Sequence, residues 1–247
     1  MHAVILRDIR SRFFNHGLGF LIVPLFPVGH ILVLLAVYQL TGRQAVFGDD
    51  LWLFFATGMV PALTFSYISR FMSVSVVANK GMLAFPAVHL LDIMLARCFL
   101  EFIGIVFSIA IIFIVLVSVG SNIIPRSPQD ALFAMLAVSL LSIGVGTIVS
   151  VLSALWPFFP MIYSLSMVLL YLGSGAPIYL GNLPEQFIYY LSFNPAFQAV
   201  EWMRSAYYLG YPTQYLDKLY LIMYGLISLN IGLLMERVMK RNILNGA

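Results

Sequence analysis

The chain has 247 residues, of which 62% are hydrophobic and only 9% are charged, and its formal net charge is +3. Soluble globular domains carry about 25% charged residues, so this composition excludes an ordinary soluble domain and indicates a membrane protein. The small positive charge is not a signature of nucleic-acid binding.

Residues 1–17 predict an amphipathic interface helix on the inner leaflet. In a helix, Ile5, Leu6, Ile9 and Phe13 share one face, and the arginines take the others. The alternative is a solvated positive anchor that only sets the topology.

Six apolar stretches follow, and each is close to the about 20 residues that a helix needs to cross a bilayer. Apart from tyrosines, their only ionisable residue is His30, which we interpret as a hydrogen-bonding group between helices. We expect an all-α polytopic membrane protein, one transmembrane domain over 1–247, with spans at 18–40, 52–69, 102–119, 131–155, 157–180 and 219–235. A transmembrane β-barrel is excluded because its strands alternate in polarity over about 10 residues.

The basic residues between these spans predict the orientation, since cytoplasmic loops are enriched in Lys and Arg. With both termini in the cytoplasm, nine basic residues lie inside: Arg7, Arg10, Arg12, Arg70, Lys80, Arg97, Arg237, Lys240 and Arg241. Four lie outside: Arg43, Arg126, Arg204 and Lys218.

The segment 78–98 is the longest predicted cytoplasmic connection. Asn79, Lys80 and Gly81 form a turn, and Pro86 can open a helix that carries an apolar stripe. We interpret the segment as two short elements around Pro86 that dock on a soluble partner. The alternative is a loop followed by the start of the third span.

The fourth span carries small residues at a spacing of four, at Ser142, Gly146, Ser150 and Ala154. Small residues let helix backbones approach closely. We expect this face to pack within the subunit, with a dimer seam as the alternative.

The segment 181–215 is too long for a simple outer loop and too interrupted to span. Two short helices that split at Asn194-Pro195 and dip back into the membrane would explain it. Glu201 and Arg204 are three apart and can pair on one helix face. The many aromatic residues either form an interfacial belt or face a conduit in which rings stack on sugars.

Catalytic motifs are absent from the sequence. It contains no G-x-x-x-x-G-K-[ST] phosphate loop and no metal-ligand motif. The predicted spans offer no carboxylate or cation for ion coupling. We expect no catalytic residue, no metal and no cofactor in this chain, so the energy for any transport must come from another polypeptide.

Four groups of residues, in order along nearly the whole chain, resemble the permeases of bacterial capsular polysaccharide exporters. These belong to the ABC-2 type group, with the O-antigen and teichoic acid permeases. The groups are L-R-D-I-R-S-R-F at 6–13 with G-L-G at 17–19; G-M-V-P at 58–61 with I-S-R at 68–70; A-N-K-G at 78–81 leading to A-R at 96–97; and Asn194-Pro195 through Glu201 and Arg204 to G-Y at 210–211. The stretch 86–89 departs from the family pattern, because it is less basic and has fewer prolines.

The resemblance implies six spans, an amphipathic N-terminal helix, a cytoplasmic coupling helix between spans two and three, and a re-entrant helical pair before span six. It also implies a homodimeric channel bound to two copies of a separate ATPase subunit, which would hold ATP and Mg. The substrate would be a lipid-linked polysaccharide exported across the inner membrane, with periplasmic and outer-membrane export components as further partners.

On this hypothesis the candidate residues fall into four groups. The ATPase-coupling group is Asn79, Lys80, Gly81, His89, Asp92 and Arg97; the entrance gate beside the lipids is Arg7, Arg10, Arg12 and Phe13; the substrate pathway is Tyr163, Tyr171, Trp202, Tyr207 and Tyr208; and the re-entrant motif is Asn194, Pro195, Glu201 and Arg204. The alternatives are an O-antigen or teichoic acid exporter, a permease for a smaller lipid or drug, and a non-transporting scaffold for polysaccharide synthesis.

Overall fold

The computed structural model describes residues 2–11, 22–42 and 44–245, and these form helices joined by irregular segments, with no strand among them. In chain order the helices are α1 (His2–Ser11), α2 (Leu25–Leu40), α3 (Leu51–Ser73), α4 (Ser75–Ala78), the short 3₁₀ helix η2 (Lys80–Ala84), α5 (Leu90–Val119), α6 (Pro128–Leu155), α7 (Phe159–Leu172), α8 (Glu185–Leu191), α9 (Pro195–Tyr207) and α10 (Lys218–Asn245). The all-α prediction is confirmed for the described residues.

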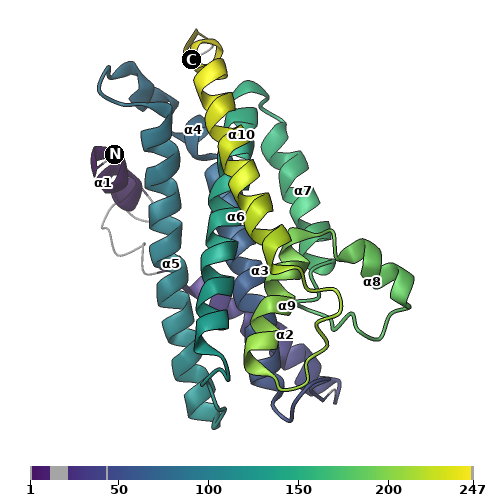
Figure 1. Ribbon diagram of the computed structural model, residues 1–247. Helices are drawn as coiled ribbons and strands as arrows, with labels where there is room; N and C mark the ends of the chain where they lie inside the picture. The colour runs from purple at the N-terminus through teal and green to yellow at the C-terminus, as the bar shows by residue number, and fades with distance from the viewer. Residues whose placement is uncertain (1, 12–21, 43, 246–247) are drawn as a thin grey trace.

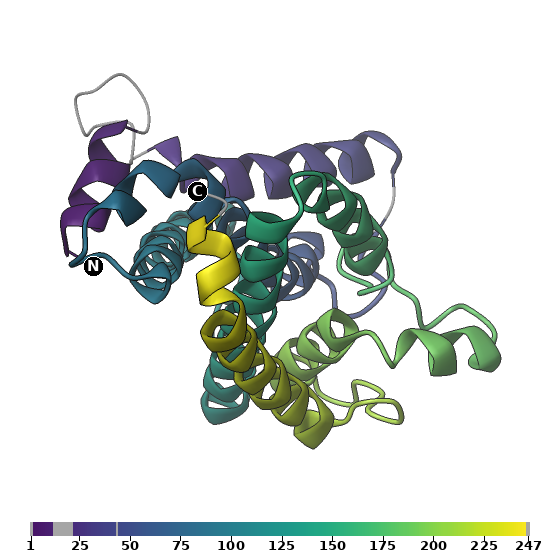
Figure 2. The same cartoon turned by 90° about the horizontal axis from the view of Figure 1, so that it is seen from above.

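Helix α3 is the most enclosed of the long helices. It contacts α2, α5, α6, α7 and α9, while α10 packs along the other side of α6 (Figure 1). Viewed from above, α2 lies at one edge of the bundle and α8 projects from another (Figure 2). The described ends of the chain, α4 and the α6–α7 connection lie in the same half of the bundle (Figure 1).

Four helices are long and apolar enough to cross a membrane, namely α3, α5, α6 and α10 up to Ile243. The other two predicted spans contain shorter apolar helices, α2 with 16 residues and α7 with 14. At 1.5 Å per residue these are about 24 and 21 Å long, below the about 30 Å of a hydrocarbon core. The structure thus supports a polytopic helical protein, and the count of six spans is not confirmed.

Helix α7 ends well before residue 180, where the sequence predicted the end of the span. The chain leaves the helix at Gly173, and Gly175 adopts φ +76°, a left-handed conformation that favours glycine. The sequence G-S-G-A-P at 173–177 is a helix-stop signal. Its apolar neighbours masked this signal in the hydropathy pattern.

Helix α5 begins at Leu90, well before the predicted span at 102. Asp92, Arg97 and Glu101 therefore belong to the same long helix as the predicted span at 102–119. These charges are tolerated because they lie near one end of the helix and have partners in the fold.

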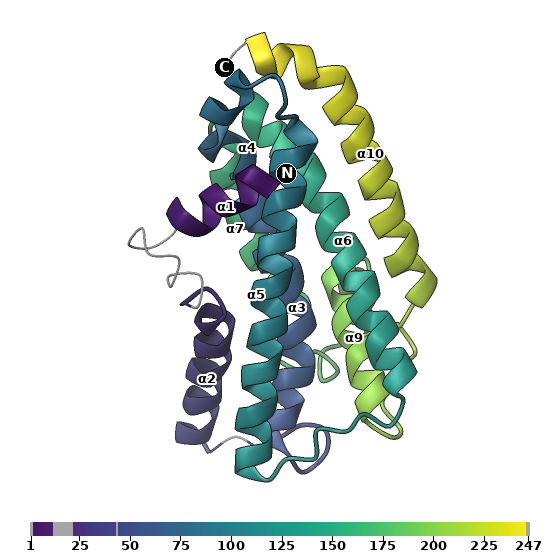
Figure 3. The ribbon, with the colours of Figure 1, turned by 90° about the vertical axis from the view of Figure 1, so that its left-hand side faces the viewer.

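Two helices separated at Asn194 and Pro195 occupy the predicted re-entrant segment, α8 and α9. The Asn194 side chain accepts a hydrogen bond from Ala196 N (3.0 Å), which caps α9, and donates to Leu170 O of α7 (2.7 Å). Helix α9 thus begins beside the last turn of α7 and runs toward the end opposite the C-terminus (Figure 3). The predicted break at this Asn-Pro pair is confirmed.

Helix α1 lies across α5 and contacts it through Val4 and Asp8, both buried (Figure 3). Of the predicted apolar face, Ile5 packs against the same buried cluster as Val4, whereas Leu6 points outward, 46% exposed. The rest of the predicted 1–17 helix, with Arg12 and Phe13, lies outside the described residues.

The small-residue face of α6 packs within the chain. A Cβ at Gly146 would lie 2.5 Å from Met72 Sδ of α3, and Ser150 Oγ lies 3.1 Å from Ser75 Oγ of α4. A Cβ at Gly144 would lie 2.6 Å from the carbonyl oxygen of Gly225 in α10. Glycines therefore set the distance of α6 from its neighbours on two sides.

We predict that Gly144→Ala lowers the free energy of unfolding of the purified protein by about 1–3 kcal/mol, the usual cost of overpacking a core. Gly29→Ala in α2 is the matched control, since nothing lies within 4 Å of its Cβ position and alanine favours the helix. Melting of both variants in the same detergent would test this, and equal melting temperatures would contradict the tight contact.

Candidate functional site

A cavity of about 300 Å³ opens between α2, α3 and α7. This volume is at the lower limit of small-molecule sites, about 300–1,000 Å³. We call it the groove, and its polar lining residues are His30, Ser66, Tyr67, Arg70, Ser164 and Tyr171.

Helical periodicity places these side chains on common faces. Ser66, Tyr67 and Arg70 follow Leu63 at spacings of three and four on α3, and Ser164 and Tyr171 are seven apart on α7. The sequence reasoning proposed Tyr171 for the pathway but missed the α3 side. Polar residues at spacings of three and four in an apolar helix were the signal that could have found it.

Tyr171 and His30 close one end of the groove. The Tyr171 hydroxyl lies 3.2 Å from His30 Nε2 and 2.9 Å from Met59 Sδ, and the two rings are 5.4 Å apart. His30 is thus a hydrogen-bonding group between α2 and α7, as interpreted from the sequence.

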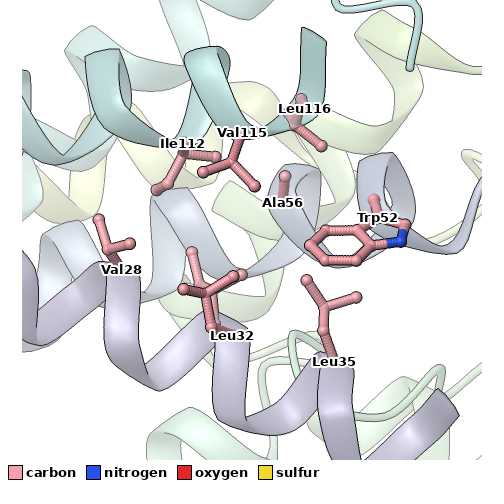
Figure 4. A pocket seen from close by; sticks show the side chains of 9 residues that line it. Val28, Leu32, Leu35, Trp52, Ala56, Ile112, Val115 and Leu116 are labelled. Carbon is pink, nitrogen blue, oxygen red and sulfur yellow. The ribbon is translucent and has the colours of Figure 1, made fainter. Parts of the chain in front are cut away.

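Figure 4 shows a second space, between α2, α3 and α5, which is lined by apolar side chains such as Val28, Leu35 and Ile112, together with Trp52. Its volume is about 10 Å³, at the lower limit for one water molecule. It is a packing gap between helices and not a ligand site.

A buried charge cluster joins α1 to α5 on the side of the chain termini. Arg97 Nη1 lies 3.4 Å from Asp8 Oδ2, and Arg97 Nε lies 3.1 Å from Glu101 Oε1 without the geometry of a hydrogen bond. The guanidinium also lies 5.0 Å from the centre of the Phe71 ring on α3. Arg97, predicted as a coupling residue, therefore links three helices.

The predicted coupling segment 78–98 has a different shape from the two short elements expected around Pro86. Lys80 and Gly81 belong to η2, residues 85–89 are not helical, and the predicted second element is the first turns of α5. The competing interpretation, a loop and the start of the third span, describes the part after Pro86 better, because α5 has its own N-terminal cap.

That cap is formed by two predicted coupling residues. Asp92 Oδ2 accepts from His89 N at 3.0 Å and lies 3.3 Å from His89 Nδ1. A third, Asn79, is buried and donates through Nδ2 to Ser75 O (3.0 Å), which ends α4. The structure brings His89 and Asp92 together and gives Asn79 a structural hydrogen bond.

The five predicted pathway aromatics occupy different environments. Tyr171 lines the groove, and Tyr163 and Trp202 are buried in one apolar cluster. Tyr207 borders an apolar cavity between α3, α5, α6 and α9, and Tyr208 packs beside Phe47 and Phe54. Their role in a pathway stays a prediction.

Arg204 and Glu201, which both belong to the described part of the chain, do not form the predicted ion pair. It is fully buried, lies 4.2 Å from the centre of the Phe54 ring and donates to Ala176 O at 3.4 Å. Gly58 leaves room for it, since a Cβ there would lie 2.6 Å from Arg204 Nη2.

Glu201 instead accepts from the Tyr211 hydroxyl at 2.7 Å. Burial raises the pKa of Tyr211, so its hydroxyl stays protonated and can donate. Arg204 is drawn away from Glu201 because the π face of Phe54 and a backbone carbonyl are both within its reach.

The sequence reasoning missed a second polar cluster around Asp130. This carboxylate accepts from Trp202 Nε1 (3.0 Å), Ser127 Oγ (2.9 Å) and Lys218 Nζ, and so joins the starts of α6 and α10 to α9. Ser127 and Asp130 have the spacing of a helix capping signature, which was the available signal.

Of the predicted entrance gate, Arg7 is exposed on α1. The side chain of Arg10, and Arg12 and Phe13 entirely, lie outside the described residues. Within the described part of the chain no cluster of His, Cys, Asp and Glu could hold a metal ion.

We predict that the groove is filled with water in the membrane. In a Cys98→Ala background, Ser66→Cys and Ser164→Cys should react with a charged maleimide, because only a hydrated thiol ionises and reacts. Ser108→Cys is the control, since Ser108 is buried between α5 and α2. Labelling no faster than that of Ser108→Cys would contradict a hydrated groove.

We also predict that Arg97→Ala destabilises the fold by about 3–5 kcal/mol, because it leaves Asp8 and Glu101 buried with fewer partners. Arg126→Ala, an exposed arginine at the opposite end, is the control. Thermal unfolding in detergent measures the difference. A decrease in the free energy of unfolding of less than about 1 kcal/mol, which is typical of exposed ion pairs, would show that the cluster does not hold α1 against the bundle.

No protein family model matches the chain. The polysialic acid transport protein KpsM of Escherichia coli is 28% identical over 246 residues, 100% of this chain and 95% of that protein. The capsule polysaccharide export inner-membrane protein CtrC of Neisseria meningitidis is 27% identical over 94% of this chain and 87% of that protein. BexB of Haemophilus influenzae, of the same description, is 25% identical over 98% of this chain and 92% of that protein. Over almost its whole length the chain is thus similar to a polysialic acid transport protein and to inner-membrane proteins named for capsule polysaccharide export.

Proposed function

We propose that this protein is the permease subunit of an ATP-driven ABC exporter that moves a lipid-linked capsular polysaccharide from the cytoplasm across the bacterial inner membrane. The observation that carries the proposal is the similarity, over almost the whole chain, to proteins named for polysialic acid transport and for capsule polysaccharide export. The polar groove in an otherwise apolar bundle supports it, since buried polar groups in a membrane protein mark substrate pathways.

In this proposal the chain has six spans, with α2 and α7 as the two short ones and α8 and α9 as the re-entrant pair. The start of α9 beside the end of α7 supports this, because a short helix can stop inside the membrane where another continues toward the far side. The termini are placed in the cytoplasm on the strength of the positive-inside rule and of their common position at one end (Figure 1).

The groove is open on one side, so one chain forms only part of a conduit. Two copies that place their grooves face to face would enclose a passage lined by Tyr67, Arg70 and Tyr171. Arg70, exposed at the end of α3, supplies a positive charge for the phosphate of a lipid-linked sugar. Neutral tyrosine rings further along give contacts of about 1 kcal/mol each, weak enough for a polymer to slide.

Energy comes from two copies of a partner ATPase that hold ATP and Mg, because the sequence contains no phosphate-binding loop. The η2 turn and the start of α5 form the contact with that ATPase, where His89 is exposed and Lys80 and Asp92 are half-buried. Arg97 carries the movement to α1 and α3, to which it is linked by Asp8 and Phe71.

We predict that Lys80→Ala, assayed with the ATPase subunit in proteoliposomes, lowers polymer export by about tenfold while ATP hydrolysis persists. The reason is that loss of one interfacial charge contact of about 1.4 kcal/mol weakens coupling tenfold. Arg126→Ala, an exposed cation at the opposite end, should export normally. Normal export by Lys80→Ala would overturn the coupling role, and a wild-type protein that moves no polysaccharide would overturn the function.

A further inference from the structure

A further cavity, of about 260 Å³, lies at the end of the bundle opposite the C-terminus, between the end of α2, the start of α3 and the segment after α7. We propose that this space, the distal cavity, is a saccharide-binding subsite that holds one sugar unit of the polymer as it leaves the groove. The inference rests on the proposed function, because it assigns a further site for the same substrate.

The lining of the distal cavity matches a sugar. The aromatic rings of Tyr38, Phe54 and Tyr179 provide apolar faces, and the side chains of Gln44 and Asn182 provide amides. Among the residues that the structure describes, no charged side chain belongs to this lining. Sugars combine apolar ring faces with hydroxyl groups that donate and accept hydrogen bonds, so flat rings and neutral amides are the complementary groups.

The two amides have no hydrogen-bond partner among the described residues, and both residues are exposed. Each amide offers two N–H donors and a carbonyl acceptor. An acyl chain in this position would cover the amides without pairing them, and an inorganic anion would find no cation among the described lining residues. The volume is below the about 300 Å³ at which pockets for drug-sized ligands begin, and so suits a single sugar ring.

The walls of the distal cavity are held from two sides. The Tyr38 hydroxyl donates to Pro177 O at 2.9 Å, which fastens α2 to the segment after α7. On the other side, Arg204 stacks on Phe54 and donates to Ala176 O. Arg204 is a positioning residue here, since it touches the wall and not the space. Such bracing reduces the entropy that a ligand must overcome on binding.

Gly181 leaves room for the Tyr179 ring. A Cβ at residue 181 would overlap the end of this ring, so the ring would have to move. A substitution at Gly181 therefore displaces the aromatic face and removes no polar group.

The distal cavity is aligned with the groove along α2. His30, at the end of the groove, and Tyr38, in the lining of the distal cavity, are eight residues apart and share one helix face. The segment after α7, which begins just beyond Tyr171, forms the opposite wall. A polymer that emerges between α2 and α7 would meet this cavity next.

The test uses the full-length protein in lipid nanodiscs and saturation-transfer NMR with glucose, N-acetylglucosamine and N-acetylneuraminic acid as probes. We expect at least one of them to bind the wild type, and Gln44→Ala and Asn182→Ala each to weaken that binding by about tenfold. Gly181→Ala should weaken it as well. Gln39→Ala is the matched control, because Gln39 is an exposed glutamine on α2 outside the lining, and its binding should equal that of the wild type.

Binding that is equal in all these variants, or absent for every probe, would overturn the inference. Folding does not confound the result, since Gln44 and Asn182 are exposed and make no hydrogen bond to another described residue. Export by the wild type with its ATPase is measured in parallel. Export without sugar binding overturns the subsite and leaves the proposed function standing, whereas absence of polysaccharide export overturns the proposed function itself.

Discussion

The close approach of α6 to its neighbours is the constraint on which the rest of the bundle depends. Gly146 admits Met72 of α3, and Gly144 admits the backbone of α10. Lipid tails are as apolar as the helices, so such contacts, and not a hydrophobic driving force, hold helices together in a membrane. With α6 and α9 covering two sides of α3, its polar strip of Ser66, Tyr67 and Arg70 can open only between α2 and α7.

Charged groups complete this arrangement at its two ends. Arg97 joins α1, α3 and α5 near the chain termini, and Asp130 joins α6, α9 and α10 near the other end. Neither cluster lies midway along the long helices, where an ion would be most costly. Among the described residues, the lining of the groove has one charged side chain, Arg70, and that of the distal cavity has none, which suits the passage of a polymer that must not be held. The substrate contacts proposed for the groove and the distal cavity are accordingly neutral rings, hydroxyls and amides, with Arg70 at one end.

Much of the helix content could be predicted from the sequence, because apolar length and composition are local properties. All six predicted apolar stretches contain helices, and the Asn194-Pro195 break is where the pattern placed it. The ends of the helices were harder to predict. Helix α5 extends back to Leu90 because His89 and Asp92 cap it, and α7 stops at Gly173, just before the left-handed Gly175.

The candidate site was less predictable, since it depends on which faces meet. By itself the sequence determined the class of protein, its helices, its lack of a phosphate-binding loop and its resemblance to polysaccharide permeases, all of which follow from composition and local order. Only the tertiary structure decided that Arg204 stacks on Phe54 while Glu201 pairs with Tyr211, and that His30, Tyr67 and Tyr171 share a groove. The physical reason is that long polar side chains have several partners within reach along their own helix. Packing against other helices selects one of them by leaving space, as at Gly58, or by removing it.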